Sequence, residues 1–198
     1  MKPARTKMGF AWLAILSLTA CVVEERKPSY LVWDLLSYHG DIDYVEGAIW
    51  DLDGVPQMTL TPLENTSISA TLTANTGTLE HEAVASGWNY LFFGVGGSCG
   101  PNWPFFLDEC GGVHEAITIT FNRDVILESV AVSSYVGIRD WQVQLTAPDY
   151  STVFTYDDMD TDWGRMTVEV FVPARQPFVI EYVSGYGFSL DEFAASID

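Results

Sequence analysis

Apolar and polar residues alternate with a period of two along most of the chain from Gln57 onward. Successive side chains of a strand point to opposite faces, so this period predicts strands that bury one face and leave the other in water. No helix-like period of normal length interrupts the pattern. The alternating segments are Met58–Thr61, Ser67–Thr73, Ala116–Phe121, Trp141–Thr146 and Met166–Val172.

Turn-forming residues separate these segments and four further apolar ones. Many short strands at this spacing favour an all-β fold, an antiparallel β-sandwich or barrel with one wet face to each sheet. Residues 31–36 and 44–50 are ambiguous between a strand and a short turn of helix. The further segments are Val125–Ser133, Thr152–Tyr156, Phe178–Val183 and Phe188–Ala194, and the turn signals are Pro56, Asn75–Gly77, Gly111–Gly112, Pro148–Asp149, Trp163–Gly164 and Gly185.

The N-terminus has the features of a secretory signal. Lys2, Arg5 and Lys7 form a basic region, residues 8–18 form an apolar run, and small residues follow. The run is too short for a bilayer-spanning helix, which needs about 20 apolar residues. An exported protein is therefore expected.

The end of that segment, Leu18-Thr19-Ala20-Cys21, resembles a bacterial lipobox. This resemblance implies cleavage before Cys21, diacylglycerol on its sulfur and an acyl chain on its new amine. An ordinary signal peptide, or an N-terminal anchor with a chance cysteine, is the alternative. The expected organisation is a signal over residues 1–20, a lipidated tether over 21–30 and one domain over 31–198. Val22 after the cysteine favours outer-membrane sorting if the cell is Gram-negative.

The charge balance excludes several partners. Removing residues 1–20 leaves 178 residues with six basic and 27 acidic side chains, a formal charge of −21. Phosphate binding needs a basic patch, so nucleic acid is excluded, and membrane contact is assigned to the lipid anchor. The excess of acidic residues has two explanations. It can keep the protein soluble in a salty exterior, or local clusters of acids can bind divalent cations.

Cys99 and Cys110 remain as a pair after the lipidated cysteine. An exported chain meets an oxidising environment, which favours a disulfide between them. A loop of this length contributes about 3 kcal/mol in the chain-entropy model. Zinc is a poor alternative, because no C-x-x-C motif or close histidine pair accompanies the two cysteines.

The C-terminal half carries a second resemblance. Glu115–Val130 combines a strand ending in Phe, a turn and Val-x-Leu-x-x-Val, and Tyr186–Phe193 reads Gly-Phe-x-Leu-Asp-x-Phe. Both segments are similar to secreted bacterial jelly-roll modules of the galactose-binding-like, carbohydrate-binding-module type. The resemblance covers residues 85–198 and rests on packing positions. It implies a jelly roll, whereas activity must be argued from a site.

An acidic run over residues 156–164 is the candidate metal site. Asp158, Asp160 and Asp162 alternate as in a calcium loop and can supply several of the oxygens that calcium needs. The run departs from an EF-hand, because Trp163 stands where glycine belongs and the later bidentate acid is missing. A solvated hairpin tip is the alternative.

A second acidic patch lies in the N-terminal region. In modules of the resembled type, a structural calcium often joins an N-terminal loop to the last strand, which makes Asp191 or Glu192 a candidate partner. Surface charge and turn formation are the plain alternatives. The patch consists of Asp41, Asp43, Glu46, Asp51 and Asp53.

Large aromatic residues inside the expected disulfide loop suggest a ligand surface. Loops usually run over the surface, and a flat ring can stack on the apolar face of a sugar. The alternative is that the rings close one end of the core. The candidate ligand-binding residues are Trp103, Phe105 and Phe106, joined by Trp88, Tyr90 and Trp163.

No catalytic motif accompanies these features. His39, His81 and His114 lack metal-ligand spacing, and Gly94–Gly97 lacks the lysine and helix of a phosphate loop, so it is interpreted as a bend. The sequence therefore favours a non-catalytic binding module, with carbohydrate as the candidate ligand. The alternatives are a structural or assembly lipoprotein that contacts another envelope protein and, with less support, a hydrolase using paired carboxylates.

Overall fold

The computed structural model describes residues 29–35, 45–46, 55–62, 65, 67–85, 89–96, 107–133, 141–155, 164–185 and 187–197. These residues form strands and turns, and the part of the chain they cover contains no helix, hence none that is long and apolar enough to cross a membrane. The all-β prediction is confirmed. A strand covers residues 29–34, so it includes most of the ambiguous segment 31–36 and begins two residues earlier, within the expected tether.

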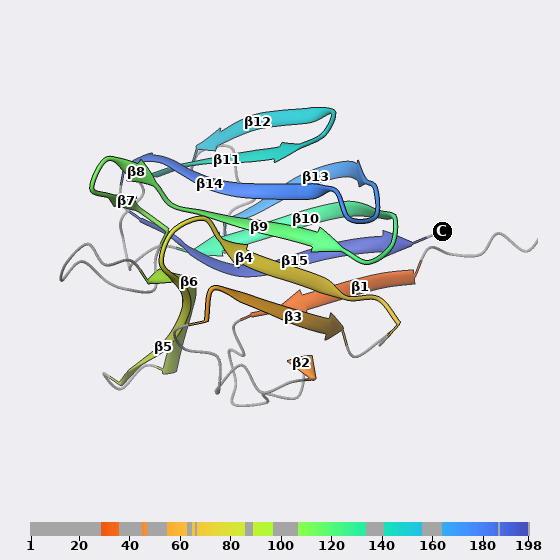
Figure 1. Ribbon diagram of the computed structural model, residues 1–198, viewed down its shortest axis with the longest axis horizontal. Coiled ribbons are helices and arrows are strands. Elements are labelled where there is room, and N and C mark those ends of the chain that lie inside the picture. Colours follow the sequence, from red (N-terminus) through yellow and green to blue (C-terminus); the bar gives the residue numbers. More distant parts are fainter. Residues whose placement is uncertain are drawn as a thin grey trace, which may run out of the picture.

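Two antiparallel sheets contain most of the strands (Figure 1). The four-stranded sheet has the order β1-β15-β10-β13, and the seven-stranded sheet has the order β12-β11-β14-β9-β4-β3-β2. The first sheet consists of β1 (Ser29–Asp34), β15 (Ser189–Ile197), β10 (Val125–Ser133) and β13 (Arg165–Val172). The second consists of β12 (Tyr150–Thr155), β11 (Trp141–Ala147), β14 (Pro177–Gly185), β9 (Ala116–Phe121), β4 (Ala70–Ala74), β3 (Gln57–Pro62) and β2 (Val45–Glu46).

The chain crosses between the sheets at nearly every connection after β9. It passes from β9 to β10, from β10 to β11, from β12 to β13, from β13 to β14 and from β14 to β15. Among these later described strands, β11 and β12 alone are consecutive neighbours in one sheet. This connectivity is that of a jelly roll, in which Greek keys wrap across two sheets. The predicted β-sandwich is therefore present, with β3 and β4 added beyond β9.

Two hairpins extend the sandwich at the end shown on the left of Figure 1. The first pairs β5 (Thr78–Ala85) with β6 (Asn89–Gly96), and the second pairs β7 (Glu109–Cys110) with β8 (Val113–His114). Gly94, Val95 and Gly96 lie within β6, so the interpretation of this glycine-rich stretch as a bend is wrong. Glycine is tolerated inside a strand, although it weakens the strand.

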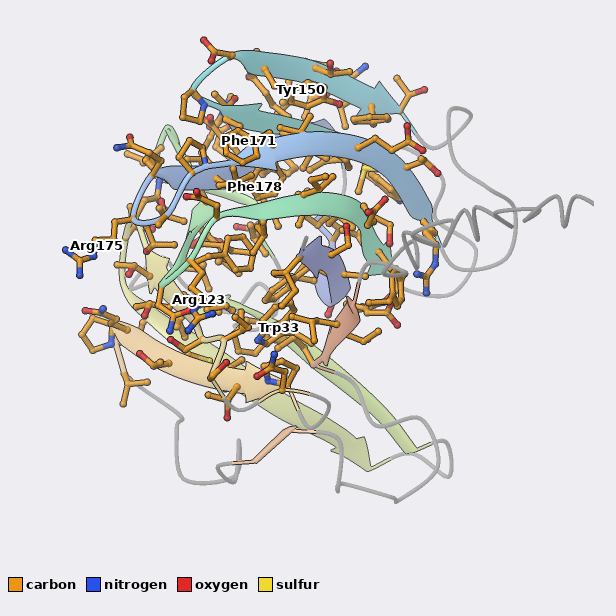
Figure 2. The ribbon with its side chains drawn as sticks, turned by 90° about the vertical axis from the view of Figure 1, so that its right-hand side faces the viewer. Trp33, Arg123, Tyr150, Phe171, Arg175 and Phe178 are labelled. Carbon is orange, nitrogen blue, oxygen red and sulfur yellow. The ribbon has the colours of Figure 1, made fainter. Side chains whose placement is uncertain are left out.

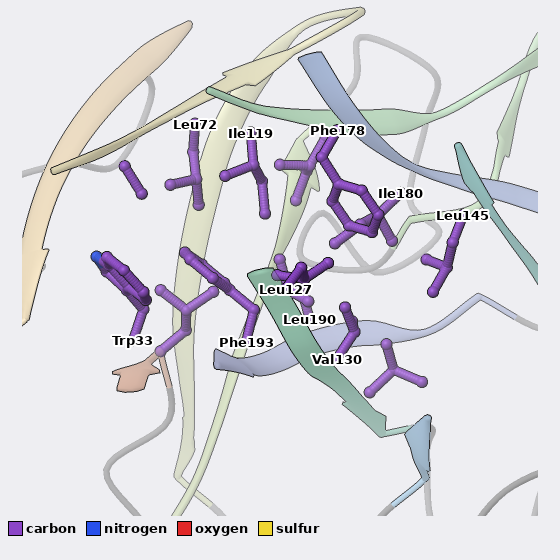
Figure 3. Packing of buried hydrophobic residues seen from close by; sticks show 14 of the residues in the cluster. Trp33, Leu72, Ile119, Leu127, Val130, Leu145, Phe178, Ile180, Leu190 and Phe193 are labelled. Carbon is purple, nitrogen blue, oxygen red and sulfur yellow. The ribbon is translucent and has the colours of Figure 1, made fainter. Parts of the chain in front are cut away.

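One hydrophobic cluster fills the space between the two sheets (Figure 3). Trp33 of β1 stacks on Phe193, with ring centroids 5.0 Å apart, and meets Phe121 of the opposite sheet edge-on at 5.5 Å. Its indole Nε1 donates to the carbonyl of Leu60 at 3.4 Å. The inward residues of the alternating strands thus form a shared core, which fixes the outward residues on two separate faces.

Candidate functional site

The outer face of the seven-stranded sheet is rich in hydroxyl and amide groups. Leu60, Leu72 and Ile119 point inward and are at most 1% exposed, so their neighbours in sequence point outward. The register of the strand pairs carries this alternation across six strands. The outward polar residues are Gln57, Thr59, Thr61, Thr71, Thr73, Thr118, Thr120, Gln142, Gln144, Thr146, Ser151 and Thr155.

These residues form rows that run perpendicular to the strands. Neighbouring strands lie about 4.8 Å apart, so a row that crosses six strands is about 24 Å long. A second, shorter row joins Thr59, Thr71 and Thr120. The longer row consists of Gln57, Thr73, Thr118, Val179, Thr146 and Ser151, each directly opposite the next.

Hydrogen bonds between side chains order parts of this face. The hydroxyl oxygens of Thr59 and Thr71 are 3.0 Å apart, and Gln144 Nε2 donates to Ser151 Oγ at 3.0 Å. A hydroxyl group has one donor and two acceptor positions, so each of these oxygens keeps capacity for a further partner. The face is therefore a partly preorganised array of donors and acceptors.

Charge is nearly absent from the same face. The sequences of β3, β4, β9, β11, β12 and β14 contain one charged residue, Glu181, in a chain with 27 acidic residues. Glu181 Oε1 lies 4.0 Å from Nδ1 of His114. A neutral polar surface on so acidic a protein suits a neutral, hydroxyl-bearing ligand, because no strongly hydrated charge has to be stripped of water.

A second cluster is a carboxyl pair beside the β7–β8 hairpin. Glu115 is 2% exposed, and its Oε2 accepts a hydrogen bond from the backbone N–H of Asp108 at 3.1 Å. The Glu115 N–H donates in turn to the Asp108 carbonyl at 2.9 Å. Burial raises the pKa of Glu115 from 4.5 to about 7, and the hydrogen-bonded carboxyl of Asp108 adds to the rise.

Burial also raises the pKa of Asp108, whereas its hydrogen bond with Glu115 acts in the opposite direction. Paired carboxylates were the sequence feature offered for a hydrolase. Glu115 is too buried to reach a substrate, and its contacts close the hairpin against the sheet. This pair is therefore structural in the conformation described.

The sequence-predicted site residues fall almost entirely outside the described residues. Cys110 lies in β7 and Tyr90 in β6, where the backbone is described and the side chains are not. The predictions of lipidation, disulfide pairing, calcium binding and aromatic contact therefore remain predictions. The residues outside are Cys21, Trp88, Cys99, Trp103, Phe105, Phe106, Asp158, Asp160, Asp162 and Trp163.

The carboxylates offered as a link from the last strand to an N-terminal calcium have other partners. Glu192 Oε1 lies 2.7 Å from Arg165 Nη1, and Asp191 Oδ1 accepts from Ser133 Oγ at 2.8 Å. Within the described ranges, no group of three or more Asp, Glu, His or Cys side chains is arranged to hold a metal ion. Four of the five residues of the N-terminal acidic patch lie outside those ranges, and only the backbone of Glu46 is described.

Sequence reasoning did not single out the polar face or the carboxyl pair. The signal for the face was present, because Thr-x-Thr occurs in Thr59–Thr61, Thr71–Thr73 and Thr118–Thr120. Only strand order shows that these three segments are neighbours. The carboxyl pair gave no signal, since Asp108 and Glu115 look like two more acids in an acidic chain.

No family model matches the chain, and comparison with curated proteins and with solved structures gives no significant match.

Proposed function

We propose that this protein is an exported, lipid-anchored, non-catalytic module that binds a neutral carbohydrate on the outer face of the seven-stranded sheet. The observation that carries the proposal is the 24 Å row of five uncharged polar side chains, interrupted only by Val179, with strands about 4.8 Å apart. An extended glycan presents hydroxyl groups at regular intervals, which such a row can meet with repeated hydrogen bonds. Each bond contributes about 1 kcal/mol, so affinity requires several of them.

The aromatic residues predicted from the sequence complete the proposed ligand surface. Trp88, Trp103 and Trp163, with their neighbours, would supply stacking on sugar rings, and the threonine and glutamine side chains would supply the hydrogen bonds. Calcium bound by Asp158, Asp160 and Asp162 remains part of the proposal as a stabiliser of the acidic loop. A chelator should then lower the melting temperature.

Loss of the threonine hydroxyls tests the binding face. Thr73→Val with Thr118→Val keeps the β-branched shape and removes two hydroxyl groups from the centre of the long row. Binding of the mature chain to neutral polysaccharides, measured by pull-down and calorimetry, should weaken about tenfold or more. Thr167→Val is the matched control, because Thr167 is exposed on the other sheet.

Failure of every neutral polysaccharide to bind, or equal binding by the double variant, would contradict the proposal. Co-purification with one envelope protein, insensitive to added sugars, would favour the assembly-lipoprotein alternative. Turnover of a glycan or ester that disappears with a carboxylate substitution would favour a hydrolase.

Lipid anchoring is tested at the cysteine itself. Cys21→Ser should leave the N-terminus without lipid and release the protein from the membrane fraction, because the domain has few cations with which to hold anionic lipid. Mass spectrometry of the N-terminal peptide and fractionation of cells measure this. Membrane retention of the serine variant would contradict the anchor.

A further inference from the structure

The tether enters the sandwich at one defined end. β1 begins at Ser29, directly opposite Ile197 near the end of β15. Residues 22–28 separate Ser29 from Cys21 and span at most about 27 Å when fully extended. If Cys21 carries the lipid anchor that we propose, this end of the sandwich lies close to the bilayer, at the right of Figure 1.

Two connected turns form the same end. Residues 122–124 join β9 to β10, and residues 173–176 join β13 to β14. The Arg175 N–H donates to the Phe121 carbonyl at 2.8 Å, and the Ala174 N–H donates to Asp124 Oδ1 at 2.7 Å. These bonds hold the two turns together as one surface, which Figure 2 views from outside.

Two of the four arginines that follow Pro28 lie on these turns. Arg123 and Arg175 are exposed, and no ion pair within the described residues involves either of them. Arg165, in contrast, begins β13 at the opposite end, where its guanidinium is paired with Glu192 and hydrogen-bonded to the side chain of Tyr30. Arg175 adopts a φ of 63°, a left-handed conformation that favours glycine, yet it presents a cation to solvent there.

An outward row on the four-stranded sheet contains two exposed aromatic residues, with half-buried Ile126 and buried Ser196 between them. Tyr30, Ser196, Ile126 and Phe171 are directly opposite one another across its four strands. Leu31, Leu127 and Val172 point into the core, so this row faces outward. Tyr30 is 52% exposed and Phe171 is 60% exposed. Exposed aromatic residues next to cations are the composition of a protein surface that rests on lipid headgroups.

The nearby acids are partly engaged. The Asp124 carboxylate accepts the Ala174 amide, and the Glu128 carboxylate accepts the Ser196 hydroxyl. Most of the chain's 27 acidic residues lie elsewhere in the sequence. An anionic bilayer repels those regions, and the repulsion acts within a Debye length of about 8 Å. At this end the two exposed arginines offset the two exposed acids Asp124 and Glu169, which lowers the repulsion there.

We infer that the turns carrying Arg123 and Arg175, with Ile126 and Phe171, form a surface that docks on the headgroups of the bilayer holding the anchor. This inference rests on the proposed lipid anchor and is independent of carbohydrate binding. The lipid anchor attaches the protein to the membrane, and docking sets its orientation. The opposite end of the sandwich, with the β7–β8 hairpin, then points away from the membrane.

Covalent labelling tests the docked orientation. The lipidated full chain is reconstituted in vesicles of phosphatidylcholine with phosphatidylglycerol, and phenylglyoxal labelling of each arginine is measured by mass spectrometry. Arg123 and Arg175 should label about fivefold more slowly than in detergent, whereas Arg165 should be unchanged. Hydroxyl-radical labelling should likewise be reduced at Phe171 and unchanged at Val153. High salt should restore the labelling of both arginines.

A charge variant and a protein attached by a different tether distinguish failure of the proposed lipid anchor from failure of the proposed docking surface. Arg123→Gln with Arg175→Asn should abolish the protection of Phe171, because asparagine tolerates the left-handed φ and neither replacement is charged. Arg139→Gln, a charge control elsewhere in the chain, should retain it. A mature chain held on nickel-chelating vesicles by a histidine tag in front of Cys21 repeats the measurement without natural lipidation. Absence of lipid on Cys21 would contradict the lipid anchor but not the docking surface. In the histidine-tagged protein, unreduced labelling of Arg123 and Arg175, or reduced labelling of Arg165, would contradict the docking surface.

Discussion

At the scale of single residues, Glu115 shows how burial changes the chemistry of an ordinary acid. Its folded-state pKa of about 7 lies above its ordinary value of 4.5, so the folded protein binds a proton more tightly than the unfolded chain does. The resulting stability is fully present below pH 4.5 and is lost as the pH rises through 7. Each pKa unit corresponds to about 1.4 kcal/mol, so the whole effect is about 3 kcal/mol.

Glu115→Gln should remove this pH dependence, because the amide resembles the protonated acid at every pH. The difference in unfolding free energy between wild type and variant, measured by urea denaturation, should change by about 3 kcal/mol in the variant's favour from pH 4.5 to pH 8. Glu181→Gln, a partly exposed carboxyl on the sheet, is the control and should show little change. A pH-independent difference for Glu115→Gln would contradict the buried proton.

At the scale of elements, the turn between β7 and β8 could be predicted from the sequence. Gly111 and Gly112 were predicted as a turn, and they connect β7 to β8 with φ values of 60° and 85°. A two-residue hairpin needs positive φ at its central positions, which glycine adopts at little cost. A β-carbon at either position would meet no atom within 4 Å, so only backbone conformation demands glycine there.

Gly112→Ala should therefore destabilise the hairpin by about 1 kcal/mol without a steric clash. Faster amide hydrogen exchange at residues 109–114, with little change in the core strands, would report the loss. Equal exchange in the variant and the wild type would show that the positive φ is not maintained. The β7–β8 hairpin also carries Cys110, so the variant shows how rigidly this cysteine is held.

The strands themselves were predictable to different degrees. Period-two alternation located β9, β11 and β13 nearly to their ends, because each has one face in the core and one in water. β6 was missed, since Asn89–Gly96 is continuously apolar at its centre and ends in glycines. β1 was ambiguous because six residues cannot separate a strand from a helical turn without a partner, and β15 is that partner.

At the scale of the whole molecule, Trp33 joins the two sheets into one folding unit. It packs on Phe193 of its own sheet and on Phe121 of the other, and it is fully buried. Trp33→Ala should cost about 3–5 kcal/mol, the usual range for removing a large aromatic side chain from a core. Val153→Ala, on an exposed position of β12, should cost less than about 1 kcal/mol.

Denaturation of the Trp33→Ala variant, followed by near- and far-ultraviolet circular dichroism, measures both the loss and its cooperativity. The unfolding transitions seen by the two signals should shift together to a lower denaturant concentration, because one core spans both sheets. Two separate transitions would show instead that each sheet is stable by itself. A loss no larger than that of Val153→Ala would mean that Trp33 does not link them.

The sequence by itself determined the all-β class, most strands and turns, and the acidic character of the chain, because these depend on local periodicity and composition. The threonines of the polar face and the two exposed arginines, Arg123 and Arg175, are also visible in the sequence. Only the tertiary structure decided which residues are neighbours. Register placed Thr73 beside Thr118, crossover connections brought Arg123 to Arg175, and the hairpin buried Glu115 against Asp108. Such long-range proximity depends on strand order, which no local pattern encodes.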